Sequence, residues 1–384
     1  MAQSTSTLSP AAPLLPAEEA ETRLVVAGQW QLIWRKFRKH RLAMAGGLVT
    51  LVIYGIAIFA EFLAPFSTER YAADFTYAPP QRLHFFAPTA EGWRWQPYVN
   101  GYKIEINYEQ GRRLFVLDPT TQHPVAFFVQ GEPYQLLGLF PTDLHLIGPV
   151  NPADPMYLFG ADRLGRDIFS RTVYGTRVSM TIGLVGVAFS LFFGILLGGV
   201  SGYFGGGIDN LIQRVIEFLQ SIPAIPLWTG LAVAIPADVP PLRVYFFITI
   251  ILSVLGWTGL ARVVRGKFYA LKSEDFVKAA RLDGCSTLRV IFRHMVPSFT
   301  SHIIAVVTLA IPGMILGETA LSFLGIGLRP PTVSWGVLLQ EAQNIRAIST
   351  APWLFLPGLA VIVAVLALNF LGDGLRDAAD PYTS

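Results

Sequence analysis

The side chains that could carry catalytic or metal chemistry are scattered along the chain. No two histidines show a metal-ligand spacing such as HxxxH or HExxH, and the single cysteine, Cys285, cannot form an internal disulfide or a multi-cysteine site. The phosphate-binding pattern GxxxxGK(S/T) does not occur, since Gly266-Lys267 is followed by phenylalanine and has no spaced glycine before it. We therefore expect no metal, no cofactor and no ATP chemistry in this chain, and we do not expect it to be an enzyme.

Residues 273–284 carry a different pattern, that of a short helix suited to docking on another protein. Ser273 can cap a helix, and Glu274 and Asp275 follow in the first turn, where the helix dipole favours acidic side chains. Gly284 suits the stop at the other end. The segment is therefore predicted to be a helix with a defined start and stop.

One face of this predicted helix combines small residues with one aromatic ring. Four positions fall at the i, i+3, i+4 and i+7 spacing of a single face: Phe276, Ala279, Ala280 and Asp283. Small side chains there would let the backbone of a partner approach closely. A second helix is predicted over residues 286–295, ending before Pro297. The alternative for the whole loop is a connector that lies on the lipid surface.

The composition indicates a membrane protein. Of 384 residues, 52% are hydrophobic and 14% are charged, against about 25% charged in soluble domains, and the mean hydropathy is +0.48. Because about 20 apolar residues cross the ~30 Å hydrocarbon layer, six segments qualify as spans. They are 42–60, 178–200, 211–235, 244–260, 299–316 and 353–371. The third is the weakest, because it carries Arg214, Glu217, Pro223 and Pro226.

Basic residues predict the orientation of these spans. The amphipathic stretch 30–41 carries five Arg or Lys residues before the first span. It is expected to be a helix on an anionic inner leaflet, or else a charge cluster that only orients the span. Eight more Arg and Lys residues lie between positions 262 and 293. Both regions and the C-terminus are therefore expected in the cytoplasm, and residues 1–22 are expected to be a disordered tail.

Residues 65–157 form a second compositional zone, expected outside the cytoplasm between the first two spans. Alternating β-branched and aromatic residues predict three strands. They cover 102–108, 113–117 and 125–129. Stretches with Pro or Gly at 118–121 and 130–133 predict turns. We expect a small β-rich domain that folds without disulfides.

The loop 274–297 resembles the EAA loop of bacterial ABC importer permeases. That family pattern is Glu-Ala-Ala, three residues, Gly, and a stretch ending in Pro, and it is met by EDFVKAARLDG at 274–284 and HMVP at 294–297. Four positions match: Ala279, Ala280, Gly284 and Pro297. Lys278 stands where the family commonly has Glu, so the resemblance implies no particular ion pair there.

Further motifs resemble the dipeptide, oligopeptide and nickel permeases of this family, in the same order. They are FGADRLGRDIFSR at 159–171, GYFGGGID at 202–209, ETALSFLGIG at 318–327, SWG at 334–336 and NFLGDGLRD at 369–377. The resemblance is close over residues 158–381 and looser over 37–63. The chain resembles the second permease of such importers, and its long insertion resembles that of the microcin C or Yej-type peptide transporters.

The resemblance implies an all-α polytopic fold with six transmembrane helices, that of a type I ABC importer permease, with a β-rich extracytoplasmic insertion. It divides the chain into a tail and basic helix (1–41), a first span (42–64), the periplasmic insertion (65–157) and a five-helix core (158–384) with a cytoplasmic coupling loop (263–298). In this family the loop helix sits in a groove of the ATPase. The residues implied to couple are Asp275, Phe276, Ala279, Ala280, Asp283, Gly284 and Pro297.

The resemblance also implies a function. The chain would be the permease subunit of an importer that moves short or modified peptides across the bacterial inner membrane by alternating access. Its partners would be a second permease, one or two ABC ATPase subunits that hold ATP and Mg, and a periplasmic peptide-binding protein, with no nucleic acid. A nickel or other small-solute importer, and a stand-alone secondary transporter, are the alternatives. No substrate-binding residue can be identified.

Several residues near the span ends remain open to two interpretations. Glu318 is either a functional intramembrane acid or a helix-end acid paired within the fold. Two groups offer a choice between local structure and partner contact: Arg163, Arg166 and Asp167 before the second span, and Asp373, Arg376 and Asp377 after the sixth. The second span also holds glycines that predict close helix packing, at positions 183, 186, 194, 198 and 199.

Overall fold

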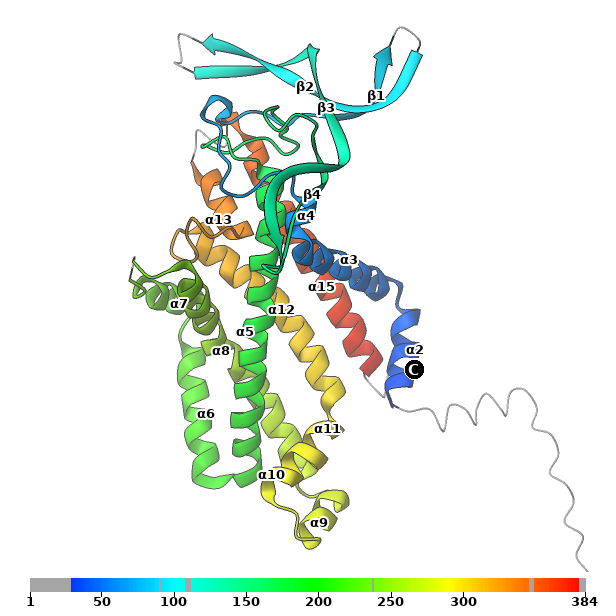
Figure 1. Ribbon diagram of the computed structural model, residues 1–384. Helices are drawn as coiled ribbons and strands as arrows, with labels where there is room; N and C mark the ends of the chain where they lie inside the picture. Colours follow the sequence, from blue (N-terminus) through cyan, green and yellow to red (C-terminus); the bar gives the residue numbers. More distant parts are fainter. Residues whose placement is uncertain (1–28, 90–91, 108–111, 237, 345–348, 380–384) are drawn as a thin grey trace, which may run out of the picture.

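The computed structural model describes residues 29–89, 92–107, 112–236, 238–344 and 349–379. Long helices form an elongated bundle, a sheet lies across one end, and short helices lie at the opposite end (Figure 1). The short helices are α9 (Asp275–Leu282), α10 (Thr287–Arg289) and α11 (Val296–Ser298). The tail predicted over residues 1–22 lies outside the described residues.

Five helices in the described part of the chain are long and apolar enough to cross a membrane. They are α3 (Arg41–Ile58), α5 (Ile168–Phe204), α8 (Pro241–Leu271), α12 (Thr300–Phe323) and α15 (Leu356–Ala379). Each overlaps one of the predicted spans. With 37 and 31 residues, α5 and α8 are longer than the ~20 residues that a span needs, so they also carry polar groups beyond the apolar layer.

The weakest predicted span, residues 211–235, is two helices in the structure. α6 (Gly206–Ser221) and α7 (Ala224–Val233) meet at a bend of 88°. Pro223 lies at the break, and Ile222 before it is extended, as a residue preceding proline prefers. The predicted third span is therefore broken at Pro223, one of the residues that made it the weakest of the six. The pair adds a sixth crossing if both helices are counted as one span.

α5 and α8 pack closely through small residues, which confirms the prediction from the glycines. A Cβ atom on Gly198 would lie 2.4 Å from the carbonyl oxygen of Ala261, and one on Gly194 would lie 2.8 Å from the Leu260 side chain. Larger residues at these positions would push the two helices apart. Glycine thus sets the distance between α5 and α8.

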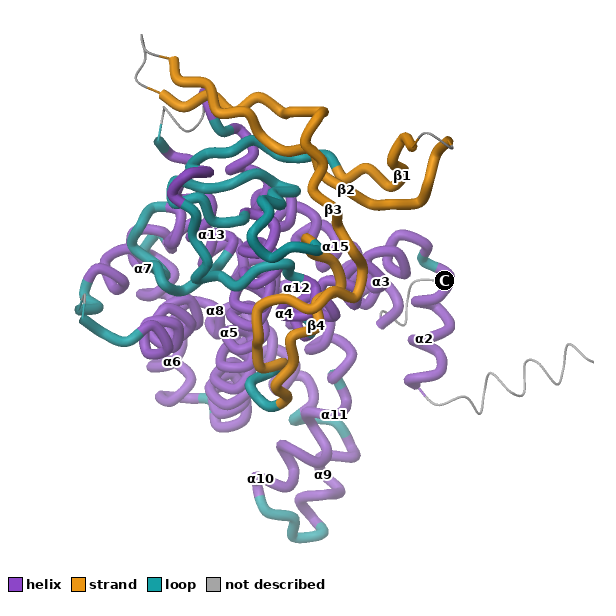
Figure 2. The backbone as a smooth tube through the Cα atoms, turned by 45° about the horizontal axis from the view of Figure 1, so that its top comes forward, coloured by secondary structure: helices purple, strands orange, loops and turns teal. Residues whose placement is uncertain are grey.

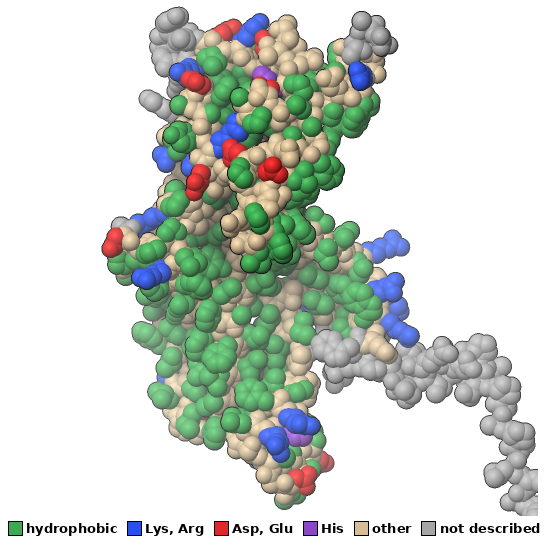
Figure 3. Space-filling model, viewed as in Figure 1, with side chains coloured by type: hydrophobic (Ala, Val, Ile, Leu, Met, Phe, Trp, Pro, Cys, Tyr) green, Lys and Arg blue, Asp and Glu red, His purple; other side chains and the backbone are tan. Residues whose placement is uncertain are grey.

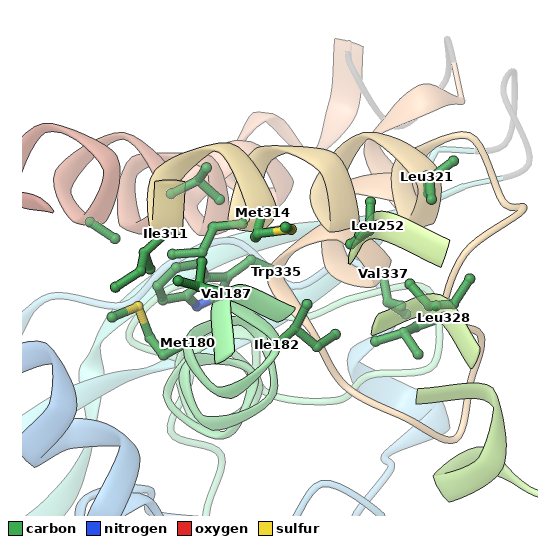
Figure 4. Close-up of a cluster of buried hydrophobic side chains, with 14 of the residues drawn as sticks. Met180, Ile182, Val187, Leu252, Ile311, Met314, Leu321, Leu328, Trp335 and Val337 are labelled. Atoms are coloured by element: carbon green, nitrogen blue, oxygen red, sulfur yellow. The ribbon is translucent and has the colours of Figure 1, made fainter. Parts of the chain in front are cut away.

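The largest hydrophobic core lies where α5, α8 and α12 meet the short helix α13 (Trp335–Gln340). Figure 4 shows buried side chains from these helices turned toward one another, including Leu252, Met314 and Trp335. The buried Trp335 indole donates its N–H to the carbonyl of Thr172 at 3.1 Å. That bond satisfies the polar edge of the ring inside the core.

The basic stretch before the first span forms α2 (Gln29–Lys39), whose apolar side packs on protein. Phe37 is buried against Leu371 and Leu375 of α15, and the exposed Trp34 ring stacks on Phe37. The cations of α2, Arg35, Lys36, Arg38 and Lys39, are exposed. Figure 3 shows Lys and Arg side chains on this side of the molecule. The anchor of this helix is therefore α15, and its basic side is exposed.

The sheet is antiparallel, in the order β1-β2-β3-β4. Its strands are β1 (Leu83–Thr89), β2 (Gly92–Asn107), β3 (Arg112–Leu136) and β4 (Phe140–Pro149). The described residues of all three predicted strands lie within β2 and β3. β3 is long enough to pair with β2 along its first half and with β4 along its second. The tube view shows how these two halves diverge (Figure 2).

The two predicted turns, 118–121 and 130–133, are bulges inside β3. The register with β2 shifts at the first, and the register with β4 shifts at the second. A proline lies in each stretch, and a bulge tolerates it because no ladder N–H is needed there. In the first bulge, the hydroxyl and the N–H of Thr120 donate to Asp118 at 2.6 and 3.0 Å, which lowers the pKa of Asp118 to about 2. The prediction that the chain reverses at these points was wrong.

The sheet is fixed to the bundle where the chain enters and leaves it. Phe66, after the first span, and Met156, before the second, are buried in one cluster with strand residues such as Val125. The Nδ1 atom of His145 lies 2.6 Å from the carbonyl oxygen of Ala64. The remaining short elements are α4 (Ala60–Leu63), η1 (Ala73–Phe75), η2 (Val290–Met295), η3 (Glu341–Gln343) and η4 (Pro352–Phe355).

Candidate functional site

The first predicted helix of the loop is α9. Asp275 lies in its first turn, as predicted. The predicted cap was wrong, because Glu274 occupies the N-cap position and the Ser273 hydroxyl donates instead to the carbonyl of Ala270 at 3.0 Å. Lys278 pairs with Asp275 across one turn at 3.2 Å. This exposed pair adds little stability.

α9 ends in a turn that suits glycine. Gly284 has a φ of +75°, which confirms the predicted stop. Its N–H donates to the carbonyl of Arg281 at 3.0 Å, and the N–H of Cys285 donates to the carbonyl of Ala280 at 3.1 Å. These two bonds form a Schellman motif, which satisfies the last carbonyls of the helix. The turn leads the chain directly into α10.

α9 turns one side to solvent and the other to the protein. Phe276, Ala279 and Asp283 are exposed, whereas Val277 and Ala280 are buried. The prediction had placed Ala280 on the same face as the exposed three. Ala280 packs instead toward Phe268 and Ile303, so the predicted outward face is wrong at this position. Ala280 belongs to the inner face.

The inner face of α9 is anchored to three long helices. Val277 and Ala280 share a buried cluster with Phe268 of α8 and Ile303 of α12. At the end of α5, the Tyr203 ring lies 4.9 Å below the guanidinium of Arg281. These contacts join α9 to α5, α8 and α12.

The rest of the loop is helical but changes its winding. After α10, residues Val290–Met295 form a π-helical segment, and α11 follows with Pro297 in its first turn. The prediction that the second helix ends before Pro297 was wrong. A π-helical turn next to the proline accommodates a residue that has no N–H to donate. Val290 and Met295 are buried in the same cluster as the inner face of α9.

A partly buried ion pair at the α9 end of the bundle was missed from the sequence. Asp209 of α6 accepts bonds from Nε and Nη2 of Arg265 of α8, both at 2.6 Å, and one from the Ser201 hydroxyl of α5. Asp209 thereby joins α5, α6 and α8 near the contact between Tyr203 and Arg281. Asp209 closes the GYFGGGID motif, but no local spacing links it to a partner 56 positions away.

At the sheet end, a buried charged cluster joins the segment before α5 to η3. Asp162 accepts from Nε of Arg166 at 2.6 Å and from Arg171. Arg166 also pairs with Glu341 at 2.9 Å. Burial, and then the nearby charge of Asp162, raise the pKa of Glu341. The cluster fixes the start of α5 against the segment that leads to α15.

Asp167 caps α5 within the same region. It accepts from the backbone N–H of Ser170 at 2.7 Å and from its hydroxyl at 2.6 Å. Burial nevertheless raises the pKa of Asp167 to about 6. Arg163 is exposed, with its Nε 3.8 Å from Glu341. Arg166 and Asp167 thus serve local structure, and Arg163 lies at the surface.

Glu318 is buried in α12 and bonded within the fold. The hydroxyls of Ser322 and Ser334 donate to its Oε1 at 2.8 and 2.7 Å. Ser334 also accepts from Val337 as the N-cap of α13. The interpretation of Glu318 as an acid paired within the fold is confirmed. Glu318 thereby joins α12 to the start of α13 through Ser334.

The charged residues after the sixth predicted span continue α15. Asp377 lies 4.0 Å from Nε2 of His40, at the junction of α2 and α3. Asp373 and Arg376 are exposed beside them. Over the described part of the chain, no group of three or more His, Cys, Asp and Glu side chains could hold a metal ion.

Two family descriptions match this chain. "Binding-protein-dependent transport system inner membrane component" covers residues 191–384, which include α9 and the rest of the loop. "N-terminal TM domain of oligopeptide transport permease C" covers residues 28–80, which include α2 and α3. All four strands of the sheet lie between these two matched ranges.

Individual relatives extend along most of the chain. The dipeptide transport system permease protein DppC of Bacillus subtilis is 30% identical over 91% of this chain and 84% of its own length. The glutathione transport system permease protein GsiD of Pectobacterium atrosepticum is 30% identical over 92% of this chain and 91% of its own. The oligopeptide transport system permease protein OppC of Haemophilus influenzae is 36% identical over 62% of this chain and 75% of its own.

Proposed function

Because this chain belongs to the family of binding-protein-dependent transport system inner membrane components, we propose that it is the permease subunit of an ABC importer for short or modified peptides. Relatives that align along most of the chain are named for dipeptides and glutathione, which supports a peptide substrate. Nickel or another small solute is the alternative within the family. A stand-alone secondary transporter fits poorly with relatives that are parts of transport systems.

The observation that carries the proposal is the two-sided structure of α9. Its outer face leaves Phe276, Ala279 and Asp283 free for a groove on the partner ATPase, with Asp275 at the start of the same helix. Its inner face fastens the helix to the long spans. In this proposal Ala280, Gly284 and Pro297 shape and hold the coupling loop, and the outer residues make the contact.

The proposed mechanism is alternating access. ATP binding in the partner closes its two nucleotide domains, and α9 moves with one of them. Because α9 packs on α8 and α12 and contacts the end of α5, the movement reorients these helices and changes the side to which the shared pathway opens. The ATPase supplies the energy, which is used only if its contacts with α9 differ between the two states.

The proposed assembly contains this chain, a second permease, one or two ABC ATPase subunits with ATP and Mg, and a periplasmic binding protein. α9 and both termini would lie in the cytoplasm, and the sheet would lie in the periplasm of a bacterial inner membrane. Support comes from the positions of α9 and the sheet at opposite ends of the bundle (Figure 1). The concentration of basic residues in the loop that contains α9 agrees with this orientation.

The test uses the whole complex, reconstituted in vesicles with a peptide-loaded binding protein. Phe276→Ala removes the aromatic anchor, and a lost anchor of about 2 kcal/mol weakens ATPase binding roughly 30-fold. We expect peptide uptake to fall at least about tenfold at limiting ATPase. Phe192→Ala is the matched control, since Phe192 lies on α5 and is 61% exposed against 42% for Phe276.

The possible outcomes test two claims separately: the peptide substrate, and the coupling role of α9. ATP hydrolysis without uptake of peptide from any loaded binding protein would refute the peptide substrate. Unchanged ATPase binding and uptake in both Phe276→Ala and Gly284→Trp would refute the coupling role of α9. Equal losses in Phe276→Ala and Phe192→Ala would refute it as well.

A further inference from the structure

The hairpin formed by β3 and β4 ends in an apolar tip, residues 136–140. Leu139 and Phe140 are 72% and 63% exposed, and no charged residue occurs from position 133 to 142. Hairpin turns in water ordinarily carry Gly, Asn, Asp, Pro or Ser. Apolar side chains gathered on such a projection indicate a surface that something other than water covers.

The backbone of the tip would suit a polar residue better. The N–H of Leu139 donates to the carbonyl of Leu136 at 3.0 Å, and Leu137 and Gly138 have φ values of +53° and +71°. Positive φ at both central positions is the geometry of a type I′ turn, which favours Asn-Gly. A leucine there crowds its own backbone more than asparagine would. The tip therefore carries an apolar side chain against the preference of its turn.

The base of the hairpin lies beside the end of the first span. Next to its base lies α4 (Ala60–Leu63), which continues α3, and the rings of Phe62 and Phe128 are 6.2 Å apart. From this base the hairpin extends away from the rest of the sheet, and in Figure 1 its tip reaches below α4 to the level of the long helices. The space-filling view shows hydrophobic side chains on the hairpin where it meets the bundle (Figure 3).

We propose that the tip inserts into the lipid leaflet on the sheet side of the membrane. Exposed apolar residues also lie at the end of the first span, Ile58 and Phe59, next to α4 at the base of the hairpin. The turn also meets the requirement of a lipid environment that backbone groups be bonded internally, because the N–H of Gly138 donates to the carbonyl of Gln135 at 3.0 Å. The proposal needs only that the bundle spans a membrane, whatever its substrate.

Charges flank the tip but do not enter it. Glu132, toward the base, accepts from the N–H of Ser67 at 3.1 Å and pairs with Arg70 at 3.4 Å. Asp143 is exposed on the other strand. A protein interface usually carries hydrogen-bonding groups around its apolar centre, whereas acyl chains need none. The uncharged stretch between these two acids therefore fits lipid better than a partner subunit.

The test uses the full complex in nanodiscs, with the only cysteine removed by Cys285→Ser. Leu139→Cys carries an environment-sensitive fluorophore, which is quenched either by nitroxide lipids or by aqueous iodide. Gln122→Cys, on the exposed part of β3 away from the tip, is the matched control. We expect lipid quenching at position 139 to exceed that at 122 at least threefold, and iodide quenching to show the reverse order. Retained ATPase activity verifies that each variant is assembled.

Two results would overturn the proposal. One is iodide quenching at position 139 as strong as at position 122. The other is photo-crosslinking from position 139 to the second permease or the binding protein in place of lipid. A second variant, Leu139→Asp with Phe140→Asp, is expected to abolish the lipid quenching of a fluorophore at position 137, and unchanged quenching there would also contradict insertion.

Discussion

At the scale of single residues, Gly284 decides how α9 ends. Its φ of +75° is open to glycine and, at small cost, to asparagine. No heavy atom lies within 4 Å of a Cβ built there, so the strain of a substitution comes from the backbone alone. The end of α9 can therefore be tested without disturbing its packing.

We predict that Gly284→Val weakens the end of α9 by ~1–2 kcal/mol, whereas Gly284→Asn is nearly neutral. Hydrogen exchange of the amides of Gly284 and Cys285, which bond back to α9, should be roughly 5–30 times faster in the valine variant. Mass spectrometry of the loop peptide measures it. Equal exchange in the two variants would contradict a backbone role for this glycine.

The second prediction concerns the buried charged cluster at the sheet end, which contains Asp162, Arg171 and Glu341. Asp162→Asn leaves Arg171, which is 2% exposed, with Glu341 as a charge partner only at 3.7 Å. Loss of one partner of a buried pair costs about 3–5 kcal/mol. Glu217→Gln, which breaks the exposed pair with Arg214, should cost less than ~1 kcal/mol. Thermal unfolding in detergent compares them, and similar melting temperatures would show that the cluster is not structural.

The raised pKa of Asp167 predicts that the stability of the protein depends on pH. Its pKa is about 6 in the folded protein against an ordinary 3.8, so folding favours the protonated carboxyl. Its contribution is full below pH 3.8 and is lost as pH rises through 6, by an amount on the order of 2–3 kcal/mol. The stability of the wild type relative to Asp167→Asn should therefore fall between pH 4 and 6. A flat difference across that range would contradict this assignment.

At the scale of elements, local signals predicted α9 well and its surroundings less well. The first-turn acid and the glycine stop are short-range features, and both are present in the structure. The outward face was misjudged at Ala280, because burial depends on Phe268 and Ile303, which are distant in the chain. The Asp209–Arg265 pair had no local signal for the same reason.

The prolines show the same limit of prediction from local sequence, because distant contacts decide their effect. Those at 119 and 133 indicated turns, but continued pairing with β2 and β4 keeps β3 in one strand, and that pairing is long-range. Pro223 indicated a tolerated irregularity, yet the helix bends by 88° there. Proline thus marks where a chain can deviate, and the neighbouring elements decide by how much.

The glycine contacts between α5 and α8 give the prediction at this scale. Gly198→Ala would place a Cβ atom 2.4 Å from a backbone oxygen of α8, so the helices must separate, at a cost of about 1–3 kcal/mol. Gly259→Ala, on α8 with nothing within 4 Å, should be neutral or stabilising. Melting temperatures of the purified permease measure both, and equal values would mean that the packing adapts freely.

At the scale of the whole molecule, labelling of the single cysteine tests the orientation of the chain in the membrane. Cys285 is partly exposed at the end of α9, on the opposite end of the bundle from the sheet. A membrane-impermeant thiol reagent should label it at least about tenfold faster in inside-out vesicles than in right-side-out cells, since the bilayer blocks charged reagents. Gln122→Cys with Cys285→Ser should show the reverse. The same order for both cysteines would contradict the proposed topology.

The entry and exit of the sheet have a consequence for how such chains diversify. Phe66 and Met156 pack in one cluster, so the segment between them leaves the bundle and returns to it at nearly the same place. Segments whose ends lie close together are the ones that tolerate insertion and exchange. The sheet is thus a replaceable module: evolution or a protein engineer could lengthen, shorten or swap it while the helices beneath keep their spacing.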